Sequence, residues 1–133
     1  MSIFIDTSAI IAVLDGDDSR QQIARETWDK LLSSGESLVA SNYVLTEIVA
    51  VAQRKLGFNA VRTFRVEARP ALEVIWVDQP IHDAAEVRLL LSGRRDLSLV
   101  DCVSFELMRQ RGISRAFTFD PHFAEQGFEC LPG

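Results

Sequence analysis

Residues 3–9, with the sequence IFIDTSA, decide the fold class. The three apolar residues from Ile3 to Ile5 form a short continuous run that stops at Asp6. Continuous apolar runs of this length are typical of strands that are buried on both faces of a parallel sheet, whereas half-exposed strands alternate. We therefore expect a buried strand that delivers Asp6 to its carboxyl end.

The rest of the chain alternates short apolar runs with longer segments of helical spacing. Further strands are expected at residues 38–40, 74–77, 116–119 and 128–131. Helices are expected at residues 19–32, 42–56, 59–68, 80–91 and 98–111, with caps or stops at Ser41, Gly57, Pro70, Gly93, Ser98 and Gly112. Strands separated by helices favour right-handed crossovers, so the predicted fold is α/β, a parallel sheet between layers of helices.

Length and composition limit the class of protein. The chain has 133 residues, 47% of them hydrophobic and 25% charged, which predicts one globular domain over residues 1–133. No apolar run approaches the roughly 18 residues of a membrane span, and the N-terminus lacks a secretory pattern, so a cytoplasmic location is expected. Cys102 and Cys130 have no zinc-finger spacing and are expected to be reduced thiols.

The overall charge does not favour nucleic-acid binding by bulk attraction. Fourteen basic residues stand against 19 acidic ones, a formal net charge of -5. The chain becomes nearly neutral if four acids act as metal ligands. Arginines also cluster, for example at Arg94-Arg95, either as solvated helix faces or as a basic rim around an acidic site.

Four acidic residues occupy positions where they can meet. Asp6 and Asp120 follow predicted strands, and the carboxyl ends of parallel strands are where ligands bind in such sheets. Glu47 borders the apolar stripe of its helix, where a carboxylate is costly unless it is paired, reaches water or binds a metal. Asp101 lies three positions after Ser98, which also fits a capping box, and Asp6 and Asp120 also fit helix caps.

If these four acids lie in one crevice, they can bind a metal ion. Four carboxylates in contact repel one another and raise one another's pKa values, so a cation is needed to offset the repulsion. Ligand sets made only of oxygen select Mg²⁺ or Mn²⁺ over zinc. Such sites hold phosphate oxygens and activate water for attack on a phosphodiester.

Four segments together resemble the motifs of a known family. In chain order they are Ile3–Ala9, Thr46-Glu47, Leu97–Cys102 and Phe117–Phe123. In their order, and over nearly the whole chain, they look like the motifs of PIN-domain ribonucleases, most closely the VapC-type toxins of toxin–antitoxin pairs.

The resemblance implies a central parallel sheet of strand order 3-2-1-4-5 and an endoribonuclease that cleaves single-stranded or loop RNA with Mg²⁺, or Mn²⁺ in its place. It also implies a homodimer and a small antitoxin that inhibits the enzyme. The family's metal-binding and catalytic acids correspond here to Asp6, Glu47, Asp101 and Asp120. Its supporting polar positions correspond to Thr7 and Ser98.

Other readings of the residues remain open. His122 near Asp120 is either a packing imidazole or a base, His82 is expected to be structural, and Asp96 stays outside the acidic set. Trp28 and Trp76 are expected in the core, although one could line a groove and stack on a base.

A phosphohydrolase of the haloacid-dehalogenase (HAD) type is one alternative function, weakened by Ser8 in place of a second acid and by the presence of only two lysines. A metal-free binding module, in which every acid is a helix cap, is the other.

Overall fold

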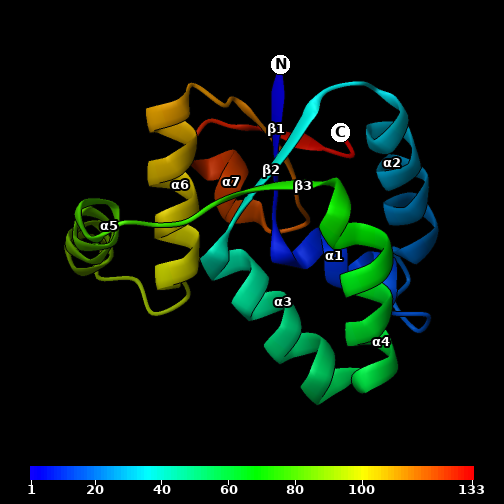
Figure 1. Cartoon of the computed structure of the whole chain (residues 1–133). Coiled ribbons are helices and arrows are strands. Elements are labelled where there is room, and N and C mark those ends of the chain that lie inside the picture. Colours follow the sequence, from blue (N-terminus) through cyan, green and yellow to red (C-terminus); the bar gives the residue numbers. More distant parts are fainter.

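A five-stranded sheet forms the centre of the structure, a computed structural model that describes residues 1–133 (Figure 1). All neighbouring strands are parallel and follow the order β3-β2-β1-β4-β5. The strands are β1 Ser2–Ile5, β2 Ser37–Ser41, β3 Leu72–Ile75, β4 Arg115–Phe117 and β5 Glu129–Leu131. The predicted α/β class and strand order are confirmed.

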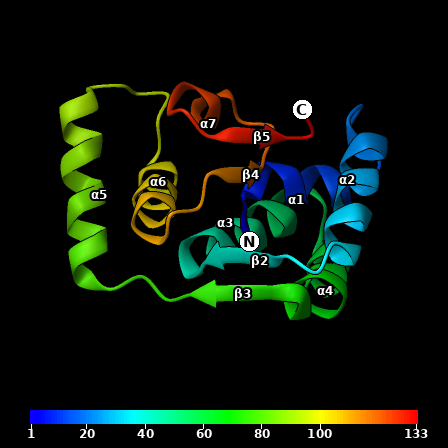
Figure 2. The same cartoon turned by 90° about the horizontal axis from the view of Figure 1, so that it is seen from above.

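Helices cover both faces of the sheet, with α5 and α6 on one side and α2 and α4 on the other (Figure 2). The helices are α1 Thr7–Leu14, α2 Gln21–Ser33, α3 Asn42–Lys55, α4 Phe58–Thr63, α5 Gln79–Ser92, α6 Leu99–Arg111 and α7 Pro121–Glu125. The starts of α3 and α6 lie near the carboxyl end of β1, where α1 also begins (Figure 1). This arrangement brings three helix starts to one edge of the sheet.

Local sequence signals set several helix ends. Ser41 caps α3 by accepting a hydrogen bond from the N–H of Val44 at 3.1 Å. Ser98 caps α6, as predicted. Gly93 and Gly112 follow α5 and α6 in the left-handed conformation, with φ of 61° and 64°, which glycine adopts without a steric penalty.

Three predicted boundaries are wrong. The strand predicted at residues 74–77 ends at Ile75, because its partner β2 ends at Ser41, which pairs with Ile75. The N–H of Val77 donates instead to Oδ1 of Asn42 at 2.7 Å. The strand predicted at residues 116–119 covers Arg115–Phe117. The helix predicted at residues 59–68 is split into α4, a π turn at Phe64–Ala68 and a 3₁₀ turn at Arg69–Ala71.

The core lies between the sheet and the helices, and it contains Phe4, Phe105, Phe117 and Phe123 as fully buried side chains. Trp28 belongs to this core, but Trp76 is 70% exposed, so the expectation that both are buried is wrong. Because β3 stops before it, Trp76 lies in the loop that leads to α5. Both cysteines are free thiols, and none of the helices has the length and apolarity that crossing a bilayer requires.

Candidate active site

Four carboxylates lie at the edge of the sheet where the strands end, and we call this set the carboxylate site. Asp6 follows β1, Glu47 lies in α3, and the remaining two members, Asp101 and Asp120, lie in the first turn of α6 and at the cap of α7. The ligand oxygens of Asp101 and Asp120 lie within 4.8 Å of each other. Burial raises the pKa values of Asp6 and Asp101; the charges of Asp101 and Asp120 add to the rise at Asp6, and those of Asp120 and Glu47 add to the rise at Asp101. Each of the four predicted acids therefore lies within electrostatic reach of at least one other.

Asp6 is buried and held by two hydroxyl groups. Its Oδ2 accepts hydrogen bonds from the hydroxyls of Ser8 at 2.6 Å and Thr118 at 2.9 Å. The Ser8 hydroxyl in turn accepts the N–H of Phe119 at 2.9 Å, and the Thr118 hydroxyl accepts that of Asp120 at 2.9 Å. These bonds fasten the start of α1 to the loop before α7, so Asp6 and Asp120 are positioned by one network.

Burial decides the protonation behaviour of Asp6. Removal from water raises the pKa of its carboxyl, the hydrogen bonds from Ser8 and Thr118 offset part of that rise, and the charges of Asp101 and Asp120 add to it. Together these effects move the pKa of Asp6 from 3.8 to about 6. A carboxyl group kept in this environment favours either a proton or a bound cation.

Asp101 is both a helix-capping residue and a member of the carboxylate site. Its N–H donates to the Ser98 hydroxyl at 3.0 Å, and its Oδ2 accepts the N–H of Ser98 at 3.2 Å, which completes a capping box. Burial raises its pKa, and the charges of Asp120 and Glu47 add to the rise. The two explanations for Asp101 in the sequence are therefore compatible.

Glu47 completes the site from α3. Its half-buried side chain lines an open hollow of about 330 Å³, together with Tyr43 and, across the gap between α3 and α6, Val100. Val100 precedes Asp101 in the first turn of α6. The hollow beside Glu47 thus reaches the residue before Asp101, and the charge of Glu47 contributes to the raised pKa of Asp101.

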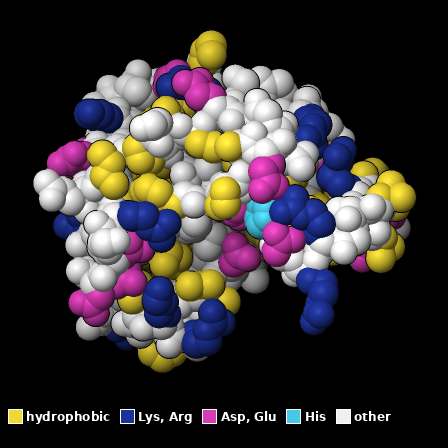
Figure 3. All heavy atoms as spheres, turned by 180° about the vertical axis from the view of Figure 1, so that it is seen from behind, with side chains coloured by type: hydrophobic (Ala, Val, Ile, Leu, Met, Phe, Trp, Pro, Cys, Tyr) yellow, Lys and Arg dark blue, Asp and Glu magenta, His cyan; other side chains and the backbone are white.

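His122 lies against the carboxylates, close to Asp120 as the sequence predicts, although the sequence leaves its role open. Its Nδ1 is 2.8 Å from Oδ1 of Asp120 and 4.0 Å from Oδ2 of Asp101. Burial lowers the pKa of His122, but the hydrogen bond to Asp96 and the charges of Asp120 and Asp101 outweigh that effect, so the pKa is raised overall. Figure 3 shows a histidine among acidic and basic side chains near the middle of one face.

The two predicted supporting residues differ in what they contact. Ser98 holds Asp101, as described. Thr7 is buried, but its hydroxyl has no hydrogen-bond partner in the chain. The hydroxyls that hold Asp6 belong instead to Ser8 and Thr118, which sequence reasoning missed. Both lie two positions from an acid of the site, a spacing that favours local side-chain to backbone bonds.

The donor set fits a divalent cation. The atoms offered by Asp101, Asp120 and His122 lie within 4.8 Å of one another, close enough to share one ion. The buried Nδ1 of His122 has no hydrogen-bond partner, and buried polar atoms of this kind need a ligand or water to satisfy them. Carboxylate oxygens at such density suit Mg²⁺ and Mn²⁺.

The lysines do not support the HAD-type alternative. Lys55 forms an ion pair with Asp15 at 3.5 Å, and Lys30 lies in α2. Neither lysine forms an ion pair with a member of the carboxylate site. A phosphohydrolase of that type needs a lysine beside its nucleophilic aspartate, and this chain does not place one there.

Comparisons with known proteins agree with the geometry. The PIN domain profile matches residues 3–129. The 23S rRNA-specific endonuclease VapC20 of Mycobacterium tuberculosis is 32% identical over 127 residues, 95% of each chain. The crystal structure of that sarcin-ricin loop cleaving toxin superposes with a TM-score of 0.83 at 31% identity, covering 95% of both chains. A DNA-bound VapBC structure from Salmonella typhimurium has the same fold, with a TM-score of 0.68 at 17% identity, covering 98% of this chain and 96% of that one. The chain thus belongs to the PIN domain family.

Proposed function

We propose that the protein is a divalent-metal-dependent endoribonuclease of the VapC toxin type that cleaves single-stranded or loop RNA. The observation that carries this proposal is the convergence of Asp6, Glu47, Asp101 and Asp120 in a chain that is 32% identical to a named endoribonuclease. The whole of residues 1–133 would then act as one nuclease domain.

The four carboxylates are the proposed ligands of Mg²⁺ or Mn²⁺. A cation held by them supplies neutralisation of the charge that develops on the phosphate and lowers the pKa of a water molecule. The chain's own part is positioning. Ser8 and Thr118 hold Asp6 through Oδ2, and the capping box holds Asp101, so two ligands are fixed before substrate arrives.

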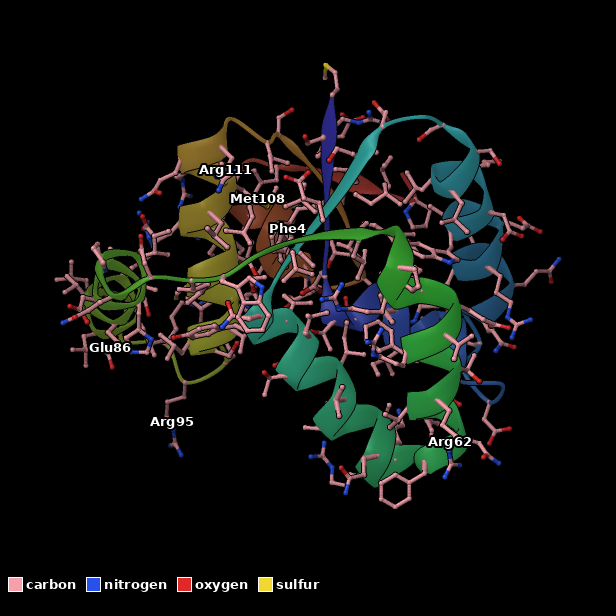
Figure 4. The ribbon with its side chains drawn as sticks, viewed as in Figure 1. Phe4, Arg62, Glu86, Arg95, Met108 and Arg111 are labelled. Atoms are coloured by element: carbon pink, nitrogen blue, oxygen red, sulfur yellow. The ribbon has the colours of Figure 1, made fainter.

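Exposed side chains near this edge support contact with RNA. Arg95, in the loop before α6, makes no ion pair and points away from the body of the protein (Figure 4). Trp76, 70% exposed, follows the end of β3. Arginine binds phosphate, and exposed aromatic side chains stack on unpaired bases. RNA sequences read by proteins are commonly presented in loops.

The relative's name suggests a substrate class. VapC20 is named as an endonuclease specific for 23S rRNA and as a toxin that cleaves the sarcin-ricin loop. For this chain we propose a structured RNA with an accessible loop. Family membership also supports a small antitoxin as inhibitor and a homodimer as the assembly.

Substrate and product analysis tests the proposal. The protein is incubated with Mn²⁺ and an end-labelled RNA stem-loop, the same stem as a plain duplex, or the same hairpin in DNA. We expect cuts in the RNA loop only, leaving 5′-phosphate and 3′-hydroxyl ends. Products with 2′,3′-cyclic phosphate, or equal cleavage of DNA, would refute this function.

A further inference from the structure

A chain of polar contacts leads from the surface to the carboxylate site through His122. Nε2 of His122 lies 3.2 Å from Oδ2 of Asp96. Arg94 holds both oxygens of Asp96, with Nε donating to Oδ1 at 3.1 Å and Nη2 to Oδ2 at 2.8 Å. Nη1 of Arg94 also donates to Glu125, at the end of α7, at 2.8 Å. The loop before α6 and the helix that carries His122 are therefore clamped together.

The opposite nitrogen of the ring points toward the acids. Nδ1 of His122 is buried without a hydrogen-bond partner, and the side chain as a whole is 12% exposed. Its separation of 2.8 Å from Oδ1 of Asp120 lacks the geometry of a hydrogen bond. A ring fixed at Nε2 by a carboxylate carries its proton there, which leaves a lone pair on Nδ1.

We propose that His122 is a further ligand of the divalent cation at the carboxylate site, binding it through Nδ1, and that Asp96 and Arg94 position its ring for that contact. This inference rests on the proposed function. Metal-binding histidines characteristically donate their second N–H to a carboxylate, which fixes the ring and raises the basicity of the ligand nitrogen. The Arg94–Asp96–His122 arrangement has this form.

The proposal predicts a metal preference. Imidazole nitrogen suits transition metals, whereas Mg²⁺ prefers oxygen ligands. A site of carboxylates plus one imidazole therefore binds Mn²⁺ more tightly relative to Mg²⁺ than a site of carboxylates alone. If His122 were instead a protonated counter-ion of Asp120, Nδ1 would have no lone pair. Replacing His122 would then change the Mn²⁺ and Mg²⁺ affinities by the same factor.

Pulsed electron paramagnetic resonance of bound Mn²⁺ tests the ligand directly. The full-length protein is stripped with EDTA, dialysed and loaded with substoichiometric Mn²⁺. We expect coupling to one directly bound nitrogen in wild type, and its loss in His122→Gln. The control is His82→Gln, because His82 also lies in a group with acids, Asp83 and Glu86, on α5. Melting of each variant in EDTA verifies that it is folded.

Binding of the two ions supplies the second measurement. In His122→Gln the Mn²⁺ affinity should fall about tenfold or more, and the Mg²⁺ affinity less than about threefold. Asp96→Asn should also lower Mn²⁺ affinity about tenfold while the nitrogen signal persists, because the ring remains present.

The outcomes separate this inference from the proposed function. Bound Mn²⁺ without nitrogen coupling in wild type, or coupling lost in His82→Gln instead, would overturn the role of His122 and leave the endoribonuclease intact. Equal losses of Mn²⁺ and Mg²⁺ affinity in His122→Gln would also overturn it. Absence of any Mn²⁺ binding to wild type would overturn both.

Discussion

Three aspartates of the carboxylate site also organise helix starts. Asp6 caps α1, Asp120 caps α7, and Asp101 belongs to the capping box of α6. A helix N-terminus carries positive potential from its unpaired N–H groups and favours a nearby negative charge. The fold therefore uses the same side chains to begin helices and to gather charge in one place.

Asp6 should make the metal-free protein less stable as pH rises. Its pKa is about 6 in the fold, above the 3.8 of an exposed carboxyl, so its contribution to stability is full below about pH 4 and is lost as pH rises through 6. This difference between the pKa in the fold and that of an exposed carboxyl corresponds to about 3 kcal/mol of unfolding free energy. In EDTA, urea unfolding of wild type and Asp6→Asn from pH 4 to 7.5 should show stability falling relative to the variant.

Ion pairs elsewhere titrate too, so the difference between the two proteins is the decisive quantity. Hydrogen bonds from Arg94 and His122 hold the pKa of Asp96 below its usual range, for example, and that effect is common to both. Parallel curves over this pH range would contradict the raised pKa of Asp6.

Asp101→Asn should separate charge from capping. The Ser98 hydroxyl still accepts the N–H of residue 101, and the amide oxygen can still accept the N–H of Ser98. Repulsion with Asp120 and Glu47 is removed. In EDTA the variant should have a melting temperature at or above that of wild type. Mn²⁺ at a hundredfold excess over its Kd should raise the unfolding free energy of wild type by about 2.7 kcal/mol, and that of the variant by less.

The opposite pattern would identify a cap alone. In that case the unfolding free energy of the variant in EDTA is lower than that of wild type by on the order of 1 kcal/mol, and Mn²⁺ raises both melting temperatures equally.

At the scale of elements, α7 depends on one buried side chain. This five-residue helix carries Asp120 at its cap and His122 in its first turn, and it packs through Phe123, which is fully buried. The ring centroid of Phe123 lies 5.0 Å from that of Phe105 and 6.5 Å from that of Phe4. This contact therefore helps to position two site residues, together with the hydrogen bonds that Asp120 and His122 make.

Phe123→Ala should lower the free energy of unfolding by about 3–5 kcal/mol, because it leaves a cavity in the core. It should also lower Mn²⁺ affinity, since α7 is no longer held. Urea unfolding in EDTA and Mn²⁺ titration measure the two effects. Phe58→Ala, at a side chain that is 62% exposed, is the matched control and should change stability by less than about 0.5 kcal/mol. A loss below about 1 kcal/mol for Phe123→Ala would contradict this packing.

The elements that sequence predicts well are those with local signals. Ser41 and Ser98 were identifiable as caps because a cap is decided within four residues. The end of β3 was not, because it depends on where β2 stops, more than thirty positions earlier. The exposure of Trp76 follows from that tertiary limit.

The carboxylate site also contains features that local sequence predicts and features that depend on distant residues. The four acids and Ser98 are recognisable from their place after strands and in first turns. The contact of Ser8 with Thr118 joins residues 110 positions apart, and that of His122 with Asp96 joins residues 26 apart. Neither pairing leaves a periodic or local trace in the sequence.

At the scale of the whole molecule, surplus apolar surface supports a homodimer. The sequence predicts this surplus on the helices of residues 42–68, at Tyr43, Leu56, Phe58 and Phe64. In the structure Phe58 is exposed, but Phe64 is 2% exposed and belongs to the core. The largest exposures on one helix occur in α5, at Val87, Leu90 and Leu91. Figure 3 shows hydrophobic side chains at this end of the molecule.

Sedimentation at concentrations on the order of tens of micromolar should therefore detect a dimer. Leu90→Lys should weaken it about tenfold or more, because it places a charge in an apolar contact. Ile23→Lys, on α2 at the opposite end of the molecule, is the control and should not change association (Figure 2). A monomeric wild type, or a dimer indifferent to Leu90→Lys, would exclude this interface.

The rate of RNA cleavage as Mn²⁺ or Mg²⁺ is returned to EDTA-stripped protein tests the central claim most directly. The carboxylate site predicts no cleavage in EDTA, recovery in wild type as the ion is added, and no recovery in Asp101→Asn although that variant stays folded. Cleavage that persists undiminished in EDTA, or an Asp101→Asn protein as active as wild type, would contradict it. A wild type that neither binds the ion nor cleaves RNA would identify a metal-free binding module instead.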